Sequence, residues 1–325
     1  MSTTAAACVV AYDDTRTASV TATRDGDIIY RARVSNADAD ADASSWDVVA
    51  RDSNPQDADI VAVALTDAAH GRIIATATAS GDLTFFRVTH GDEGSTLTRV
   101  GYASTGTPTG GASFAPAGLR AFHAPTLAFA GADGVLRLFA PRDASTVTAW
   151  EEIGTYEGKT PGAELTSVAW RRGGESSGVV DFPVIATTSR FASDDTHPIV
   201  VNVLAYDVTY ARWNVLKEIR GGSLPSGADA RARWSTWSPT TTARGALDLA
   251  IVAGRTCVIY EFTGLTVRSL ESAREIGVLP HEHALNNASW NASGSALATA
   301  ARDGVVRLWT ANLQSGVWQE YAQTK

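Results

Sequence analysis

Short runs of alternating apolar and polar residues, separated by turn residues, repeat along the chain, and the pattern is clearest near its end. Four such runs follow one another there, at 285–290, 297–300, 305–309 and 317–321. Gly294 and the pair Asp303-Gly304 mark turns between them. A period of two is typical of half-buried strands, so the four runs predict a four-stranded antiparallel sheet of the kind found in propeller blades.

The same order of four runs recurs five times upstream. The predicted blades cover residues 5–52, 57–105, 110–158, 163–221, 228–280 and 283–323. Blades of WD-repeat proteins usually take ~40–45 residues, so these blades carry long loops and six of them use the whole chain. We therefore predict an all-β fold in which residues 1–325 form a single six-bladed WD-repeat β-propeller domain.

The position of the terminal runs within the repeat predicts how the propeller ends. The first run is the first strand of a blade and the last run is the fourth strand of another, so we expect an open propeller without a terminal-strand latch. Unpaired strand edges can accept strands from another chain. The backbone groups that we expect to flank a gap between the first and sixth blades belong to Val9, Val10, Ala11, Val317, Trp318 and Gln319.

Composition and charge narrow the choice of partners. A net charge of −8 argues against the dense basic surface that direct nucleic-acid binding requires. No run of 18 apolar residues predicts a transmembrane segment, and the N-terminus lacks the features of a signal peptide. Cys8 and Cys257 lie in apolar, strand-like runs, which indicates buried free thiols in a reducing compartment, the cytosol or nucleus.

Four residues near the end of the chain have the spacing of the WD-repeat structural tetrad: His281, Thr299, Asp303 and Trp309. In that network a histidine bridges an aspartate and a hydroxyl, and the hydroxyl accepts the indole N–H. A set of this composition also resembles a hydrolase triad. Because all four residues belong to one predicted blade, the structural interpretation is favoured. Other blades keep only parts of the tetrad, with Asp25 and Asp133 at the turn and Phe86, Phe139, Tyr206 and Tyr260 at the indole position.

Other candidate sites fail on their spacing. Asp38, Asp40 and Asp42 alternate as in a calcium loop, but the glycine and glutamate that an EF-hand requires are absent. His281 and His283 are too close for a helical zinc motif, and no C-x-x-C or nucleophile-elbow sequence is present. We therefore predict no catalytic, metal or cofactor site and a protein that is not an enzyme.

The nine tryptophans fall mostly on predicted strands, where core packing is expected. Trp150, Trp213 and Trp318 lie on predicted outer strands and are candidates for partial exposure. Exposed aromatic side chains there would suit a protein interface.

Seven segments together carry a family resemblance. They are residues 112–116 (ASFAP), 132–141 (ADGVLRLFAP), 149–151 (AWE), 167–170 (SVAW), 193–195 (SDD), 289–291 (SWN) and 303–312 (DGVVRLWTAN). In this order, with six blades, the chain resembles the SEH-type WD-repeat nucleoporins, the Sec-thirteen homologues. The first two blades are the most divergent part of the match.

The resemblance implies a structural scaffold subunit of the Y-shaped subcomplex of the nuclear pore complex at the nuclear envelope. It implies that a helical (α-solenoid) nucleoporin inserts a three-stranded blade into the open propeller, and that other Y-complex subunits are further partners in nucleocytoplasmic transport of protein and mRNA. It also implies a second role in a nutrient-signalling coat on the cytoplasmic face of the vacuole or lysosome, and no cofactor.

Three alternatives stay open. A propeller of the COPII vesicle coat would accept strands in the same way, and a general WD-repeat adaptor would instead bind short peptides. A six-bladed hydrolase would need acidic residues that converge on the central channel, and the sequence contains no motif for them. The partner's identity and the choice among pore, signalling coat and vesicle coat are not determined by the sequence.

Overall fold

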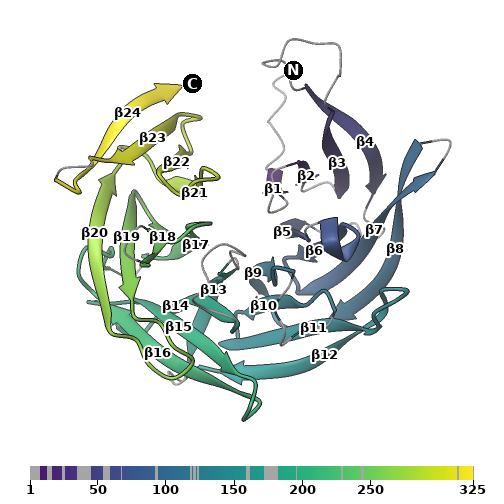
Figure 1. Cartoon of the computed structure of the whole chain (residues 1–325), viewed down its shortest axis with the longest axis horizontal. Coiled ribbons are helices and arrows are strands. Elements are labelled where there is room, and N and C mark those ends of the chain that lie inside the picture. The colour runs from purple at the N-terminus through teal and green to yellow at the C-terminus, as the bar shows by residue number, and fades with distance from the viewer. Residues whose placement is uncertain are drawn as a thin grey trace. The chain divides into compact units, whose positions relative to one another are not determined.

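The chain forms strands β1 to β24 and one short 3-10 helix, η1, in a computed structural model (Figure 1). The structure describes residues 8–12, 17–23, 26–34, 45–53, 59–66, 68–91, 94–117, 119, 122, 124–158, 162–171, 182–194, 196–227, 230–242, 245–312 and 315–324.

The strands form six four-stranded sheets, the blades, each built from strands that are consecutive in the sequence. Blade 1 has β1 (Cys8–Tyr12), β2 (Ala18–Thr23), β3 (Asp27–Val34) and β4 (Ser45–Ser53). Blade 2 has β5 (Ile60–Leu65), β6 (Ile73–Thr78), β7 (Asp82–Gly91) and β8 (Gly94–Ser104), with η1 (Ala68–His70) between β5 and β6. Blade 3 has β9 (Thr109–Phe114), β10 (Leu127–Gly131), β11 (Val135–Asp143) and β12 (Thr148–Glu157). Blade 4 has β13 (Ala163–Trp170), β14 (Val184–Phe191), β15 (Ile199–Asp207) and β16 (Arg212–Arg220). Blade 5 has β17 (Ala232–Trp237), β18 (Leu247–Ala253), β19 (Thr256–Thr263) and β20 (Ser272–Pro280). Blade 6 has β21 (Leu285–Trp290), β22 (Ala296–Ala301), β23 (Val306–Ala311) and β24 (Trp318–Thr324).

The fold prediction is confirmed: the protein is an all-β, six-bladed propeller of four-stranded antiparallel sheets. In the described part of the chain, β1 pairs with β2 and β24 pairs with β23, so neither terminal strand joins the sheet at the other end. Several fourth strands are longer than predicted. In β8, for example, half-buried Ser95 and exposed Thr96 add polar residues to the paired strand ahead of the apolar run that predicted it.

Glycine permits the tight turns between the second and third strands of several blades. Gly81, Gly134 and Gly304 have φ values of +92°, +84° and +82°, a left-handed region that disfavours other residues. At Gly81 a Cβ would also collide with the carbonyl group of Thr107. These turns set the register of the hairpins that they connect.

Within the propeller the residues group into two compact units. Unit 1 comprises Met1–Ala117, His123–Phe129 and Leu138–Gly154, and unit 2 comprises Gly118–Phe122, Ala130–Arg137 and Thr155–Lys325. In unit 1, one apolar cluster lies between blades 1 and 2 and contains Tyr30 and Phe86. In unit 2, clusters lie between blades 4 and 5 and between blades 5 and 6. In these clusters a sheet face of one blade is buried against its neighbour within the same unit, the layering that stabilises short sheets.

No helix in the ranges that the structure describes has the length and apolar character needed to cross a membrane.

Candidate interaction surface

Three of the four predicted tetrad residues are joined by hydrogen bonds in blade 6. The indole Nε1–H of Trp309 donates to Oγ1 of Thr299 at 2.9 Å, and Nε2 of His281 lies 2.8 Å from the same oxygen. The Thr299 side chain is 0% exposed. A hydroxyl so enclosed cannot reach a substrate, so the network holds β22, β23 and the end of β20 together.

The predicted contact between His281 and Asp303 is wrong. Nδ1 of His281 lies 2.9 Å from the carbonyl oxygen of Leu279, so both ring nitrogens are engaged without the carboxylate. Asp303 instead accepts the backbone N–H of Val305 at 3.0 Å, and its other oxygen lies 3.8 Å from Nε2 of His283. The backbone carbonyl prevails because it is two residues away on the same strand end.

The network defines the protonation of His281. With Nδ1–H donating to Leu279, a neutral ring leaves Nε2 free to accept the hydroxyl proton of Thr299, whose oxygen in turn accepts from Trp309. Burial lowers the pKa of His281 below its ordinary value, although the bond to Leu279 opposes this. The neutral form is therefore the one that the blade stabilises.

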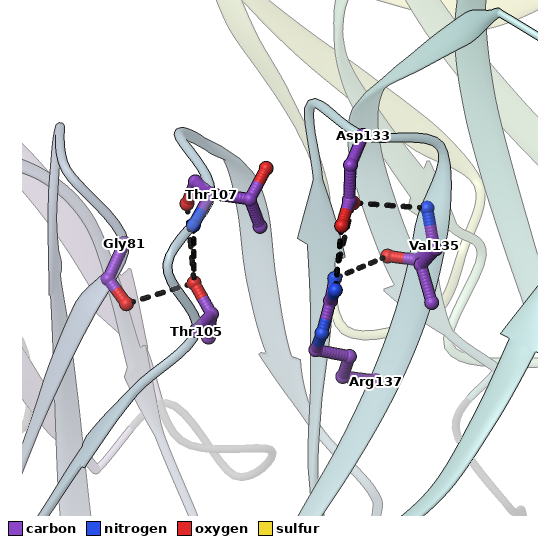
Figure 2. A network of polar contacts seen from close by, with 6 residues as sticks. All are labelled: Gly81, Thr105, Thr107, Asp133, Val135 and Arg137. Atoms are coloured by element: carbon purple, nitrogen blue, oxygen red, sulfur yellow. Dashed lines mark hydrogen bonds and ion pairs between the residues drawn. The ribbon is translucent and has the colours of Figure 1, made fainter.

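Turn carboxylates elsewhere in the propeller also serve local structure. In blade 3, Asp133 accepts from Arg137 at 2.5 and 3.0 Å and from the N–H of Val135, as Figure 2 shows. The bond from Arg137 is the main cause of the lowered pKa of Asp133. Figure 2 also shows Thr105 donating to the carbonyl of Gly81 at 2.9 Å in blade 2. The turn carboxylate of blade 2, Asp82, accepts from the hydroxyl groups of Ser80, Tyr102 and Ser104, so the described turn carboxylates of both hairpins are paired.

Blade 1 repeats the hydroxyl contact of blade 6 with a different donor, which the sequence analysis missed. Nη1 of Arg31 donates to Oγ1 of Thr21 at 2.7 Å, and these residues are ten apart, as Trp309 and Thr299 are. Arg31 therefore takes the place of the indole. The spacing of ten to a threonine was the signal that could have identified it.

No group of three or more metal-ligating side chains comes together among the residues that the structure describes. Asp38, Asp40 and Asp42, the residues that resemble a calcium loop, lie outside the described residues, as does Asp25. A cavity of roughly 10 Å³ beside Tyr156 and Ser189 in unit 2 has room for about one water molecule, too little for a substrate.

Burial along the second strand differs between the terminal blades and the inner blades 2, 3 and 5, and in inner blade 4 only the last two residues of β14 are half-buried. Strands β6, β10 and β18 are buried at every position, so both of their faces are covered. In β22 of blade 6, buried and half-buried residues alternate along the strand. In β2 of blade 1, Thr21 and Thr23 are half-buried, whereas Ser19 on the same face is buried. Each terminal blade thus has one covered face and one open face.

The open face of blade 6 is small and apolar. Leu297 and Trp309 belong to the cluster shared with blade 5. Because side chains alternate along a strand, the residues next to these two on each strand face away from blade 5. Those residues are Ala298 and Ala300 on β22, Val306 and Leu308 on β23, and Ala322 on β24. They are half-buried, except Ala322, which is exposed. We call these five residues the blade 6 open face.

The open face of blade 1 is more polar. Arg31 and Thr21 lie on it, with Ile29 beside them and Val48, which pairs with Arg31 and is 44% exposed. In the described part of the chain, no carboxylate forms an ion pair with Arg31. The two terminal blades therefore offer different chemistry to whatever covers them.

The predicted edge residues of β1 lie on both faces of blade 1. The side chains of Val9 and Ala11 pack against the core between blades 1 and 2, and Val10 alternates with them. β1 is an edge strand of its sheet, as is the first strand of every blade. An edge position therefore does not by itself distinguish these residues as a partner site.

The predicted edge residues of β24 are also divided. Val317 precedes β24 and is 62% exposed, and Gln319 pairs with Thr310 on the side of the open face. Trp318 instead points toward blade 5, where its ring lies 5.7 Å from that of Trp290. That the backbone of β1 and β24 flanks a partner stays a prediction, and the open faces extend well beyond these edges.

Two of the outer-strand tryptophans fill space above a glycine on the preceding blade. Trp150 on β12 lies over Gly101 on β8, where a Cβ would collide with the indole, and it stacks on Phe85 at 3.8 Å. Trp318 on β24 lies over Gly277 on β20 in the same way. Trp150 is 6% exposed, so the prediction of partial exposure is wrong for it, because its indole is enclosed by blade 2. Trp213 and Trp318 are half-buried.

Blade 5 contains a buried carboxyl group. Asp248 on β18 is 7% exposed, and no described group donates a hydrogen bond to its Oδ1. It pairs in register with Glu261, which itself accepts from Arg274 at 2.7 Å. Burial, reinforced by the charge of Glu261, raises the pKa of Asp248 to about 7.

No protein-family model and no curated protein sequence matches the chain. What is established is thus the β-propeller fold, with an open sheet face on each terminal blade.

Proposed function

We propose that the protein is an SEH-type scaffold subunit of the Y-shaped nuclear pore subcomplex at the nuclear envelope. A helical nucleoporin donates β-strands that cover the open faces of the terminal blades, and other Y-complex subunits bind the assembled pair. The protein is a rigid binding platform in this role, and it has a second role in a nutrient-signalling coat on the vacuole or lysosome. It needs no cofactor and makes no direct contact with nucleic acid.

The observation that carries the proposal is the contrast between β18, buried at all seven positions, and β22, in which every second residue is half-buried. An apolar sheet face stabilises a fold only when another layer covers it. Blade 6 presents such a face, and among the described strands none from the other end of the chain joins its sheet. Strands supplied by a partner would provide the missing layer and would bury area as obligate interfaces do.

Co-expression with the helical nucleoporin of the Y-complex tests the proposal. We expect a complex that co-elutes in gel filtration and melts at a higher temperature than the isolated chain. Leu308→Lys, which places a charge on the blade 6 open face, should abolish co-elution. Val208→Lys, at an exposed position of blade 4 that belongs to neither terminal blade, should preserve it.

The same assay separates the rival functions. Co-elution with cage subunits of the COPII coat in place of nucleoporins would assign the protein to vesicle transport. Protection of the backbone amides of 9–12 from hydrogen exchange without any partner, with no helical protein bound, would favour an ordinary peptide-binding adaptor.

A further inference from the structure

The blade 6 open face contains a receiving position, a place where a small residue leaves room for a large side chain of a neighbouring sheet. The comparison with other blades identifies it. In blades 1, 2, 5 and 6 the third strand pairs with the fourth strand, and a β-bulge leaves one residue of the fourth strand unpaired. Immediately after the bulge each fourth strand carries a small residue opposite a larger one. These pairs are Tyr30 and Ala50, Phe85 and Gly101, Ile259 and Gly277, and Leu308 and Ala322. In blade 4, Lys217 holds the position and is the exception.

In three of these blades a bulky side chain of the next blade covers the small residue. Trp150 covers Gly101, and Trp318 covers Gly277, as their close approach to an added Cβ shows. In blade 1, Leu97 of blade 2 packs against the cluster that contains Ala50. The small residue is what allows the large side chain to enter, because a longer one would occupy the same space.

Blade 6 has the same pair, and among the described residues of unit 2 no bulky side chain covers it. Ala322 is exposed, whereas Ala50 at the corresponding place in blade 1 is 7% exposed. Leu308 beside it is half-buried, whereas its counterparts Phe85 and Ile259 are 0% exposed. The geometry for receiving a bulky residue is therefore present in blade 6 and unused by the chain's own described residues.

We propose that the sheet covering blade 6 inserts one large apolar side chain, tryptophan or leucine, over Ala322 and against Leu308. This inference rests on the proposed function and specifies the chemistry of the partner: an outer strand with a bulky apolar residue facing blade 6. The inserted side chain acts as the central anchor of the interface, a role that buried aromatic residues commonly have.

A pair of peptides tests the inference on the full chain. Two disulfide-cyclised β-hairpins, identical except for Trp or Ala at one central position, are labelled and titrated by fluorescence polarisation. We expect the Trp hairpin to bind at least tenfold more tightly than the Ala hairpin. Ala322→Trp, which fills the receiving position, should weaken binding of the Trp hairpin at least tenfold. Val208→Trp, which adds a tryptophan at an exposed position of blade 4, should not.

The outcomes separate the two proposals. Equal binding of both hairpins, lost in Leu308→Lys, would overturn the anchor and leave the open face as a docking surface. Binding that is indifferent to both Leu308→Lys and Ala322→Trp would overturn the docking surface as well. If neither hairpin binds, the anchor is overturned, and the co-expression assay then decides the proposed function by itself. Circular dichroism of each variant confirms that the propeller is folded.

Discussion

Trp318 of β24 lies so close over Gly277 of β20 that a Cβ on the glycine would come within 2.6 Å of the indole Cδ1. The contact joins the outer strands of blades 5 and 6, and the equivalent contact of Trp150 with Gly101 joins blades 2 and 3. A glycine on one blade thus determines where the tryptophan of the next blade is placed.

Gly277→Ala should destabilise the protein by about 1–3 kcal/mol, because the new methyl group must displace a packed indole. Chemical unfolding followed by tryptophan fluorescence measures the change. Gly154→Ala is the matched control: it lies on the outer strand β12, with nothing within 4 Å of an added Cβ. Equal stabilities of the two variants would contradict the account of the indole as rigidly packed.

Thr299→Val should cost about 2 kcal/mol of unfolding free energy. The substitution preserves shape but leaves the Trp309 Nε1–H and the acceptor nitrogen of His281 without their shared partner in a buried site. Thermal unfolding at neutral pH measures the loss. Thr324→Val, at the exposed end of β24, should change stability little. A stable Thr299→Val variant would mean that the network contributes nothing to blade 6.

Acidification should weaken blade 6 through His281. Because burial depresses the native pKa of this ring below its ordinary value of about 6.5, its contribution is complete above that pH. The contribution declines as the pH falls through the lower native pKa, since the unfolded chain binds the proton more readily. An NMR titration of the His281 ring should give a pKa below the ordinary value, and a value above it would contradict this arrangement.

Asp248→Asn should remove a pH dependence of the opposite sign. The native pKa of Asp248 is raised to about 7, so its contribution to stability is complete below the ordinary pKa of the unfolded chain and is lost as the pH rises through 7. The wild-type chain should therefore lose stability relative to the variant between pH 4 and pH 8, on the order of 3 kcal/mol. The difference in unfolding free energy between the two proteins, measured at each pH, isolates this group from His281.

Glu261→Gln provides the control for that experiment. Removing the neighbouring negative charge should lower the pKa of Asp248 and shift its stability loss toward more acidic pH. An unchanged profile would mean that burial alone raises the pKa of Asp248.

The sequence predicts the strands of this protein better than it predicts the hydrogen-bond partners of its polar side chains. The period-two runs of blade 6 and the glycine turn at Gly304 are local features, and local backbone preference decides them. The partner of His281 is not local in this sense. Leu279 is two residues from His281 and Asp303 is much farther along the chain, and only the folded position of the ring shows that the carbonyl of Leu279 is its partner.

The sequence by itself determined the six blades, their strand order and the absence of a terminal latch, because each follows from periodicity and from the phase of consecutive strands. Only the tertiary structure decided which faces are open. Trp318 was expected at a partner edge, yet it packs on Gly277, while the exposed Ala322 four residues later lies on the other face. The physical reason is the bulge in β24 between them, which changes which side of the sheet the following residues face.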